Sequence, residues 1–455
     1  MKLRVRHHGA AWAFLALFVL SQVLLWLACY GHGAKSLIGD EQAYQNTALA
    51  ILAGGPWMPS SIWPPLQPLL LAALYALFGP HLLVAQIAQT LLLIGCAALL
   101  RGLWRDLGGS VAAANWGAAL FLLSPQIAGF AQWLWPEIPH LFLLLAALRL
   151  LAAARRVPAH GWIAAAIAGI CVGLALLAKS LLAAFWPVLL LMFVQRARPR
   201  LAWRSALGYV LALGVITAPA LLHGWRSYGT PMIADSSIYN LWIGLTDRAR
   251  SDYVADMGGV ELPAFLASGA TPQERNAAYL QNVKAYVAEH GLASVALAQL
   301  ERQYFRLFSA KTLLVSQLPG PACAGHLSVY HSPPWLTRTL VLVNDASHAL
   351  ILVGAAFGLA CWRRRIHMLH IVVALLLGYQ LALFGLIHVK ARFLLPMLPF
   401  LCALCGEVLA RVLAPRRDDG ALALSLPRLG LGTLLAALLL VLAFAGPVLD
   451  GLCGR

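Results

Sequence analysis

Long apolar runs alternate along this chain with short clusters of basic residues. Of its 455 residues, 61% are hydrophobic and only 11% are charged. An average soluble domain is about 45–50% apolar and about 25% charged, so a soluble globular fold is a poor match and a disordered chain is excluded. A helix needs roughly 20 apolar residues to cross a hydrocarbon core about 30 Å thick, and the runs have that length. We therefore predict an all-α polytopic membrane protein.

Eleven transmembrane helices are predicted. The apolar segment Leu66–Phe78 is not counted among them, because its 13 residues would form a helix only about 20 Å long. We expect it to form a re-entrant or interface-lying helix on the outer side. The first apolar run is expected to be an uncleaved helix rather than a signal peptide. The predicted spans lie near residues 9–30, 82–100, 111–126, 137–154, 161–179, 181–197, 205–222, 339–361, 366–387, 393–411 and 429–449.

The net charge of +16 is explained by where the basic residues lie. With the N-terminus in the cytoplasm, all six basic clusters fall on the cytoplasmic side, as the positive-inside rule requires. No cluster is interleaved with aromatic residues in the way of a single-strand-binding face, so we expect no nucleic-acid partner. The clusters are Lys2, Arg4 and Arg6; Arg101 and Arg105; Arg149, Arg155 and Arg156; Arg196, Arg198, Arg200 and Arg204; Arg363, Arg364 and Arg365; and Arg411, Arg416, Arg417 and Arg428.

Three regions follow from this topology. Residues 1–222 form an N-terminal transmembrane module whose first outer loop is 31–65, residues 223–338 form an outer hydrophilic region with juxtamembrane helices, and residues 339–455 form the C-terminal transmembrane helices. Most of the 17 acidic residues fall on the outer side, so chemistry is expected there. The chain has no P-loop, no dinucleotide-binding glycine motif and no paired metal spacing among its eight cysteines.

Two adjacent carboxylates, Asp40 and Glu41, stand in the first outer loop, with Tyr44 one helical turn later. Neighbouring carboxylates repel each other, so one of their pKa values is expected to rise. A general base or a cation site uses such a pair. A structural interpretation is equally open and is compatible with the first: Asp40 is the N-cap of a helix that runs from Glu41 to Leu52.

Several outer cations run against the positive-inside tendency and indicate an anion partner. His388, Lys390 and Arg392 lie together at the start of the tenth span. Lys179 lies at the outer junction of two spans, where it could pair with a phosphate or simply snorkel to the interface. Glu137 follows two tryptophans and is either part of the site or an ordinary helix-start carboxylate.

The polar–aromatic segment around Tyr239 and Asn240 suits the binding of a sugar ring, although interface anchoring is just as common. Pro65 belongs to a rigid proline turn before the short apolar segment.

In this order, the motifs resemble those of the GT-C class of polytopic glycosyltransferases. They are most similar to the family-39-type group of protein O-mannosyltransferases and lipid A aminoarabinose transferases. The motifs that carry the resemblance are Gly39-Asp40-Glu41 with Tyr44, Pro64-Pro65-Leu66, Leu77-Phe78-Gly79, Ser124-Pro125, Pro136-Glu137, Leu177-Ala178-Lys179, and Lys390-Ala391-Arg392-Phe393 followed by Pro396 and Pro399.

The resemblance implies a hexosyl- or pentosyltransferase that uses a polyprenyl-phosphate-linked sugar on the non-cytoplasmic face. Asp40 would be the general base, with inversion at the anomeric carbon, and Glu41 would assist it or bind a cation or sugar. Lys179, His388, Lys390 and Arg392 would bind the donor phosphate. The substrate would contact Tyr44, Pro65, Glu137, Tyr239 and Asn240.

The family's usual tyrosine after the late arginine is replaced here by Phe393, so any role of its hydroxyl is absent. No cofactor is certain. A divalent cation stays open, with Asp40 and Glu41 as its candidate ligands.

The acceptor is expected to be a lipid, glycan or protein, and the location is expected to be the bacterial inner membrane with the site facing the periplasm. Two alternatives also stay open: a secondary transporter and a non-catalytic lipid-handling protein.

Overall fold

The computed structural model describes residues 2–30, 34, 35, 37, 39–156, 161–194, 202–247, 249, 250, 257–311, 313–315, 326, 327, 332–362, 365–413 and 425–450. The basic residues at 196–200, 363, 364, 416 and 417, which the predicted topology used, lie outside these ranges. Nearly all of the described chain is helical, which confirms the predicted all-α class. Its two short strands, β1 (Ala34–Lys35) and β2 (His326–Leu327), pair antiparallel.

The helices follow one another with short connections. The α-helices are α1 (Lys2–Tyr30), α2 (Asp40–Leu52), α3 (Leu66–Phe78), α4 (Leu82–Asp106), α5 (Val111–Leu123), α6 (Pro125–Gly129), α7 (Glu137–Arg156), α8 (Gly161–Ala178), α9 (Trp203–Tyr228), α10 (Ser237–Thr246), α11 (Met257–Ala267), α12 (Pro272–His290), α13 (Leu292–Phe308), α14 (Pro334–Ala360), α15 (Met368–Phe384), α16 (Leu398–Val412), α17 (Leu426–Phe444) and α18 (Gly446–Leu449). The 3₁₀-helices are η1 (Phe130–Gln132), η2 (Ser180–Leu182), η3 (Trp186–Phe193) and η5 (Ala391–Leu394).

Six of the described helices, α4, α7, α8, α9, α14 and α17, are long and apolar enough to cross a membrane. The bent pair of α5 with the segment Pro125–Gln132 brings the number to seven if it forms one span. Large apolar side chains on these helices point outward, among them Val215 and Leu434, which are 71% and 68% exposed. An apolar surface of this kind requires lipid around it. The chain is therefore a multi-pass membrane protein.

The predicted count of eleven spans is not confirmed. The segment predicted as a span at 181–197 forms the 3₁₀-helices η2 and η3 instead of an α-helix. The span predicted at 393–411 becomes the separate elements η5 and α16. Pro187, Pro396 and Pro399 account for both differences, because proline removes a helical hydrogen bond and clashes with the preceding turn.

Close helix packing depends on small residues at several crossings. A side chain on Gly169 would meet the carbonyl oxygen of Tyr209, and one on Gly406 would meet Gly117 on a neighbouring helix. Small residues at such contacts let helix backbones approach each other where lipid supplies no hydrophobic driving force.

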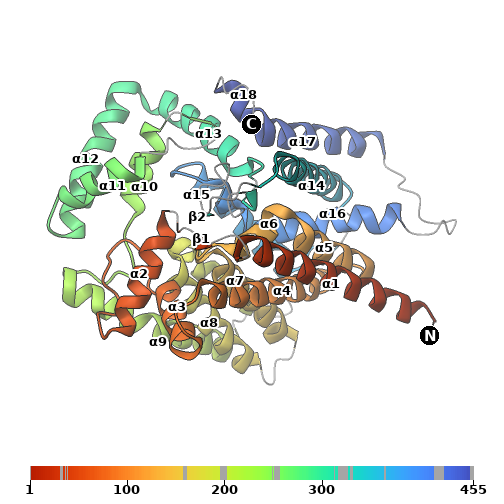
Figure 1. Ribbon diagram of the computed structural model, residues 1–455, viewed down its shortest axis with the longest axis horizontal. Helices are drawn as coiled ribbons and strands as arrows, with labels where there is room; N and C mark the ends of the chain where they lie inside the picture. The colour runs from red at the N-terminus through yellow and green to blue at the C-terminus, as the bar shows by residue number, and fades with distance from the viewer. Residues whose placement is uncertain are drawn as a thin grey trace.

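Helices α2, α3 and α10–α12 gather at one end of the molecule, on the left in Figure 1. Helix α3 has the predicted bounds, and its Leu71 and Tyr75 pack against Tyr44 and Ala48 of α2. Helix α7 begins at Glu137 and ends at Arg156, so Arg155 and Arg156 lie about 28 Å along the helix axis from Glu137. Arg155 and Arg156 therefore lie at the opposite end of this helix from Glu137.

Candidate active site

Four charged side chains meet at the end of the molecule that carries α2 and α3. The Nη2 atom of Arg392 lies 2.5 Å from Oδ2 of Asp40, and its Nε atom lies 3.3 Å from Oε1 of Glu137. The same Glu137 oxygen lies 3.1 Å from Nζ of Lys179. The sequence predicted each of these four residues, and the fold brings them together from α2, α7, the end of α8 and η5.

Asp40 is the first residue of α2, and Gly39 is the N-cap with a φ of 58°. The interpretation of Asp40 as the cap is therefore wrong. This backbone conformation favours glycine, which places the next carboxylate in the first turn, where the helix dipole stabilises a negative charge.

Asp40 is ionised in this site. Burial raises the pKa of its carboxyl, but Arg392, Lys390 and Lys179 lower it by more, so the pKa lies below its usual value. The predicted repulsion between Asp40 and Glu41 does not decide this pKa, because the two carboxylates have different partners.

Glu41 is fully buried and is turned to a second group of residues. Its Oε1 atom accepts hydrogen bonds from Nζ of Lys35 and from the backbone N–H of Leu134, the latter at 2.9 Å. Lys35 also lies 4.8 Å from the centre of the Trp133 ring. Glu41 therefore ties the first outer loop to the segment Trp133–Trp135. The candidate metal ligands Asp40 and Glu41 form ion pairs with different residues, Arg392 and Lys35.

The segment Trp133–Trp135 is held rigidly by buried glutamines. The backbone oxygens of Gln132, Trp133 and Leu134 accept from the side chains of Gln86, Gln89 and Gln67, in that order. The indoles of Trp133 and Trp135 stack with their centres 4.2 Å apart.

The Trp135 ring is in turn a platform for a cation, because the guanidinium carbon of Arg392 lies 4.5 Å from its centre. Cation–π contact and two carboxylates together fix the position of Arg392.

The two cations of the site respond differently to their surroundings. Burial lowers the pKa of Arg392, but Glu137 and Asp40 raise it by more, and the guanidinium stays charged. Burial lowers the pKa of Lys179, and so does the charge of Arg392. Glu137 raises it by less, so the pKa of Lys179 lies below its usual value. Lys179 also lies 4.4 Å from the centre of the Phe393 ring. Two carboxylates and two cations therefore neutralise each other in a partly closed space.

His388 connects the segment that carries Lys390 and Arg392 to α10 through a backbone hydrogen bond. Its ring is buried, and its pKa lies well below the usual value because of burial and the charges of Lys390, Arg306 and Arg392. Its backbone N–H donates to the carbonyl oxygen of Asn240 at 2.8 Å. These influences favour the neutral ring, whereas the sequence offered His388 only as a potential cation.

Arg306 links the segment near His388 to the outer helices. It forms a buried ion pair with Asp247 at 2.8 Å and lies 3.3 Å from Nδ1 of His388. Tyr239, one residue before Asn240, packs against Phe265 with ring centres 5.3 Å apart. Tyr239 and Asn240 thus join the outer helices to the segment that carries Lys390 and Arg392.

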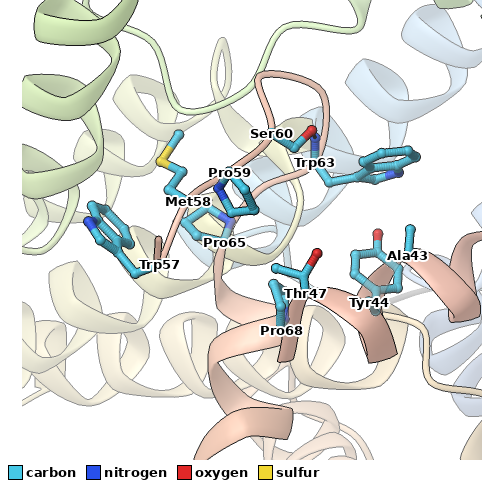
Figure 2. A pocket seen from close by; sticks show the side chains of 10 residues that line it. All are labelled: Ala43, Tyr44, Thr47, Trp57, Met58, Pro59, Ser60, Trp63, Pro65 and Pro68. Carbon is cyan, nitrogen blue, oxygen red and sulfur yellow. Dashed lines mark hydrogen bonds between the residues drawn. The ribbon is translucent and has the colours of Figure 1, made fainter. Parts of the chain in front are cut away.

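A small pocket lies between α2, the start of α3 and the loop before α3 (Figure 2). Tyr44 and Pro65, both predicted to contact substrate, belong to its wall. Figure 2 shows Trp57 and Trp63 at opposite ends of the group, with Thr47 and Tyr44 below the loop. The lining residues are Ala43, Tyr44, Thr47, Trp57, Met58, Pro59, Ser60, Trp63, Pro65 and Pro68.

Among the described residues, no group of three or more His, Cys, Asp or Glu side chains could hold a metal ion. The residues that sequence reasoning missed are Lys35 and the three glutamines behind Trp133–Trp135. Polar glutamines inside apolar runs were a usable signal, since a buried amide needs a hydrogen-bond partner.

No protein-family model matches the chain, and no curated protein matches it. Among solved structures, the chain is similar to ArnT from Cupriavidus metallidurans bound to undecaprenyl phosphate, with 16% identity over 88% of this chain and 78% of that one, at a TM-score of 0.39. It is also similar to the Archaeoglobus fulgidus oligosaccharyltransferase in the apo form, with 15% identity over 96% of this chain and 55% of that one, at a TM-score of 0.48.

ArnT is a lipid A aminoarabinose transferase, one of the groups that the sequence motifs resemble. This chain spans about half the length of the oligosaccharyltransferase.

Proposed function

We propose that this chain is a GT-C-type membrane glycosyltransferase that moves a sugar from a polyprenyl-phosphate-linked donor to an acceptor hydroxyl or phosphate. The observation that carries the proposal is the contact between the ionised carboxylate of Asp40 and Arg392, with Lys179 in the same group of charges. The reaction needs a base to deprotonate the acceptor and positive charge to stabilise the leaving phosphate, and this group of residues contains a base and two cations.

Asp40 acts on the acceptor. Its carboxylate takes the proton of an acceptor hydroxyl, whose oxygen attacks the anomeric carbon of the donor sugar from the face opposite the phosphate. The bond between that carbon and the phosphate oxygen breaks as the new bond forms, and the electron pair leaves with the phosphate. The product therefore has the inverted anomeric configuration.

Arg392 and Lys179 act on the leaving group. The polyprenyl phosphate gains negative charge as the bond breaks, and a guanidinium and an ammonium held in place stabilise that charge at no cost in reorganisation. Trp135 and Phe393 support the two cations by cation–π contact.

The donor also changes the state of Asp40. Without donor, Arg392 is bound by Asp40 and Glu137, and Lys179 is bound by Glu137. The phosphate oxygens compete for the same two cations. Phosphate binding draws Arg392 away from Asp40 and leaves the carboxylate available to the acceptor.

The acceptor is a lipid, glycan or protein, and the site faces the periplasm of a bacterial inner membrane. This part of the proposal rests on the basic residues at one end of α7 and the site at the other end.

The test is transfer by the full chain in proteoliposomes. Radiolabelled undecaprenyl-phosphate-linked sugars are supplied with an envelope extract as the source of acceptor, and the anomeric configuration of the product is determined by NMR. We expect an inverted product and a loss of about 100-fold or more in Asp40→Asn. The matched control is Glu289→Gln, because Glu289 is an exposed carboxylate on α12. Retention of configuration, or undiminished transfer by folded Asp40→Asn, would falsify the proposal.

A further inference from the structure

His140 is a buried histidine that the proposed transfer does not use. It lies one helical turn after Glu137 on α7 and is 1% exposed. Its Nδ1 atom lies 3.0 Å from the carbonyl oxygen of Ala175 on α8. A carbonyl oxygen only accepts hydrogen bonds, so Nδ1 carries the hydrogen. The other ring nitrogen, Nε2, is buried and has no hydrogen-bond partner among the residues that the structure describes.

Glu137 and His140 face the same end of α8. Positions i and i+3 of a helix are neighbours on one side, with Cβ atoms roughly 5–6 Å apart. The oxygen of Ala175 that His140 contacts also accepts the backbone N–H of Lys179 at 2.9 Å. Glu137 in turn contacts the side chain of Lys179. The imidazole and the carboxylate are therefore neighbours against the last turn of α8.

The carboxylate of Glu137 has one unused oxygen. Lys179 and Arg392 both contact Oε1, whereas Oε2 is buried without a hydrogen-bond partner in the described part of the chain. If the donor phosphate draws both cations away, Glu137 is left as a buried carboxylate without a cation. Removing the partner of a buried charge is strongly destabilising, so the site needs a replacement.

A proton on Nε2 of His140 supplies that replacement. The protonated ring donates from Nε2 to Glu137, so both unused atoms gain a partner and the buried carboxylate keeps a positive charge beside it. Imidazole is also the more basic group, with an ordinary pKa of about 6.5 against about 4.3 for a glutamate. We therefore expect the proton to bind the ring rather than the carboxylate.

Glu137 and Lys179 are the charged groups that act on the ring of His140. The elements packed against α7 are α4, α8, η1 and η3, and neither η1 nor η3 contains a titratable residue. Gly95 of α4 lies against Phe142 and Gly102 lies against Arg149, so the titratable residues of α4 lie beyond His140 toward the other end of α7. The titratable residues of α4 and α8 are Cys96, Arg101, Arg105, Asp106 and Cys171.

We propose that His140 takes up one proton when the donor phosphate binds, and that the charged ring replaces Lys179 and Arg392 as the partner of Glu137. The proton comes from the surrounding water and bonds to Nε2 through its unused lone pair. His140 acts through Glu137 and is a positioning residue, because it lets the two cations stay with the phosphate. This inference rests on the proposed function, since it needs Arg392 and Lys179 to bind the donor phosphate.

The test counts the protons taken up on binding. The full chain in phosphatidylcholine nanodiscs is titrated with a polyprenyl methyl phosphate, a diester that carries one charge and has no proton of its own to release. Calorimetry in two buffers of different ionisation enthalpy gives the number of protons exchanged. We expect the wild type to take up about one proton per lipid bound, so Kd rises about tenfold per pH unit between about pH 5 and pH 8.

His140→Asn removes the titrating group and keeps an amide N–H for the oxygen of Ala175. We expect this variant to take up almost no proton and to bind the diester at least about tenfold more weakly at neutral pH, because Glu137 is left unpaired. Glu137→Gln is the second variant. It removes the carboxylate that the proton serves, and we expect it to bind the diester without proton uptake although His140 is present.

The matched control is His348→Gln. His348 is also buried, and its Nε2 atom lies 2.9 Å from the carbonyl oxygen of Phe308, outside the charged group. Thermal unfolding checks that each variant is folded. Proton uptake that is lost in His140→Asn and kept in His348→Gln supports the inference.

Three results overturn the inference: no proton uptake in the wild type, uptake that persists in His140→Asn, and uptake that is lost equally in His348→Gln. Binding of the diester without proton uptake leaves the phosphate role of Arg392 and Lys179 intact. Absence of diester binding contradicts the proposed function together with this inference, so the two failures are told apart.

Discussion

The guanidinium of Arg392 lies 2.5 Å from the carboxylate of Asp40, although 352 positions separate the two residues in the chain. This contact joins the first outer loop to the segment before α16. It also places a carboxylate beside a guanidinium, which is the arrangement that the proposed reaction needs.

Replacing Arg392 by lysine is predicted to impair transfer although the charge is kept. A lysine cannot contact Asp40 and Glu137 together while lying flat on Trp135, as the planar guanidinium does. We expect a fall in kcat/KM for the donor of about 10- to 100-fold. Kinetics with varied donor concentration check this, and an unchanged kcat/KM would mean that Arg392 acts only as a diffuse positive charge.

The pH dependence of Arg392→Gln is predicted to differ from that of the wild type. Arg392 is the largest of the influences that lower the pKa of Asp40, so its removal raises that pKa. Because the base must be ionised, the acidic fall in kcat/KM moves to higher pH in the variant.

The same shift has a consequence for stability. The stabilisation from the lowered pKa of Asp40 is fully present above the pKa of the unfolded chain and is lost as the pH falls through the folded pKa. Thermal unfolding of wild type and Arg392→Gln between about pH 3 and pH 7 measures this. An identical pH dependence in the two proteins would show that the pair does not control Asp40.

Glu137→Gln is predicted to bind bare undecaprenyl phosphate more tightly than the wild type. Glu137 holds both Lys179 and Arg392, so its neutralisation frees the two cations for the phosphate. We expect a decrease in Kd of about three- to tenfold, which corresponds to about 0.6–1.4 kcal/mol. Calorimetric titration in nanodiscs provides the value. Weaker binding would contradict the idea that Glu137 competes with the phosphate for the two cations. It would indicate that Glu137 serves to position them.

Glu41 is predicted to stabilise the fold rather than to take part in the transfer reaction. Glu41→Gln removes the carboxylate that pairs with the buried ammonium of Lys35 and is expected to destabilise the protein by about 3–5 kcal/mol. The double variant Lys35→Met with Glu41→Gln removes both charges of the ion pair, and the glutamine oxygen can still accept from the backbone N–H of Leu134. We expect it to recover stability in thermal unfolding and to keep most of the transfer activity per folded molecule. Loss of transfer in the folded double variant would assign a chemical role to Glu41.

The sequence was sufficient to predict the helical membrane fold, the short helix Leu66–Phe78 and the members of the charged group. Hydrophobicity and charge placement determine these features directly. The broken helices η2 and η3 were not predicted, because apolar composition alone does not distinguish a 3₁₀-helix from an α-helix.

The partners within the site were not predictable either. The order Asp40-Glu41 suggested one acidic pair, whereas tertiary packing turns Asp40 to Arg392 and Glu41 to Lys35. Likewise, His388 is a potential cation in the sequence, but burial and the charges of Lys390, Arg306 and Arg392 lower the pKa of its ring well below the usual value.

The most direct test of the account separates donor binding from chemistry at Asp40. Single-turnover transfer from a radiolabelled undecaprenyl-phosphate-linked sugar is measured for wild type and Asp40→Asn, with donor binding measured on the same preparations. The account predicts that both proteins bind the donor and that only the wild type transfers the sugar. Equal transfer by folded Asp40→Asn would contradict it.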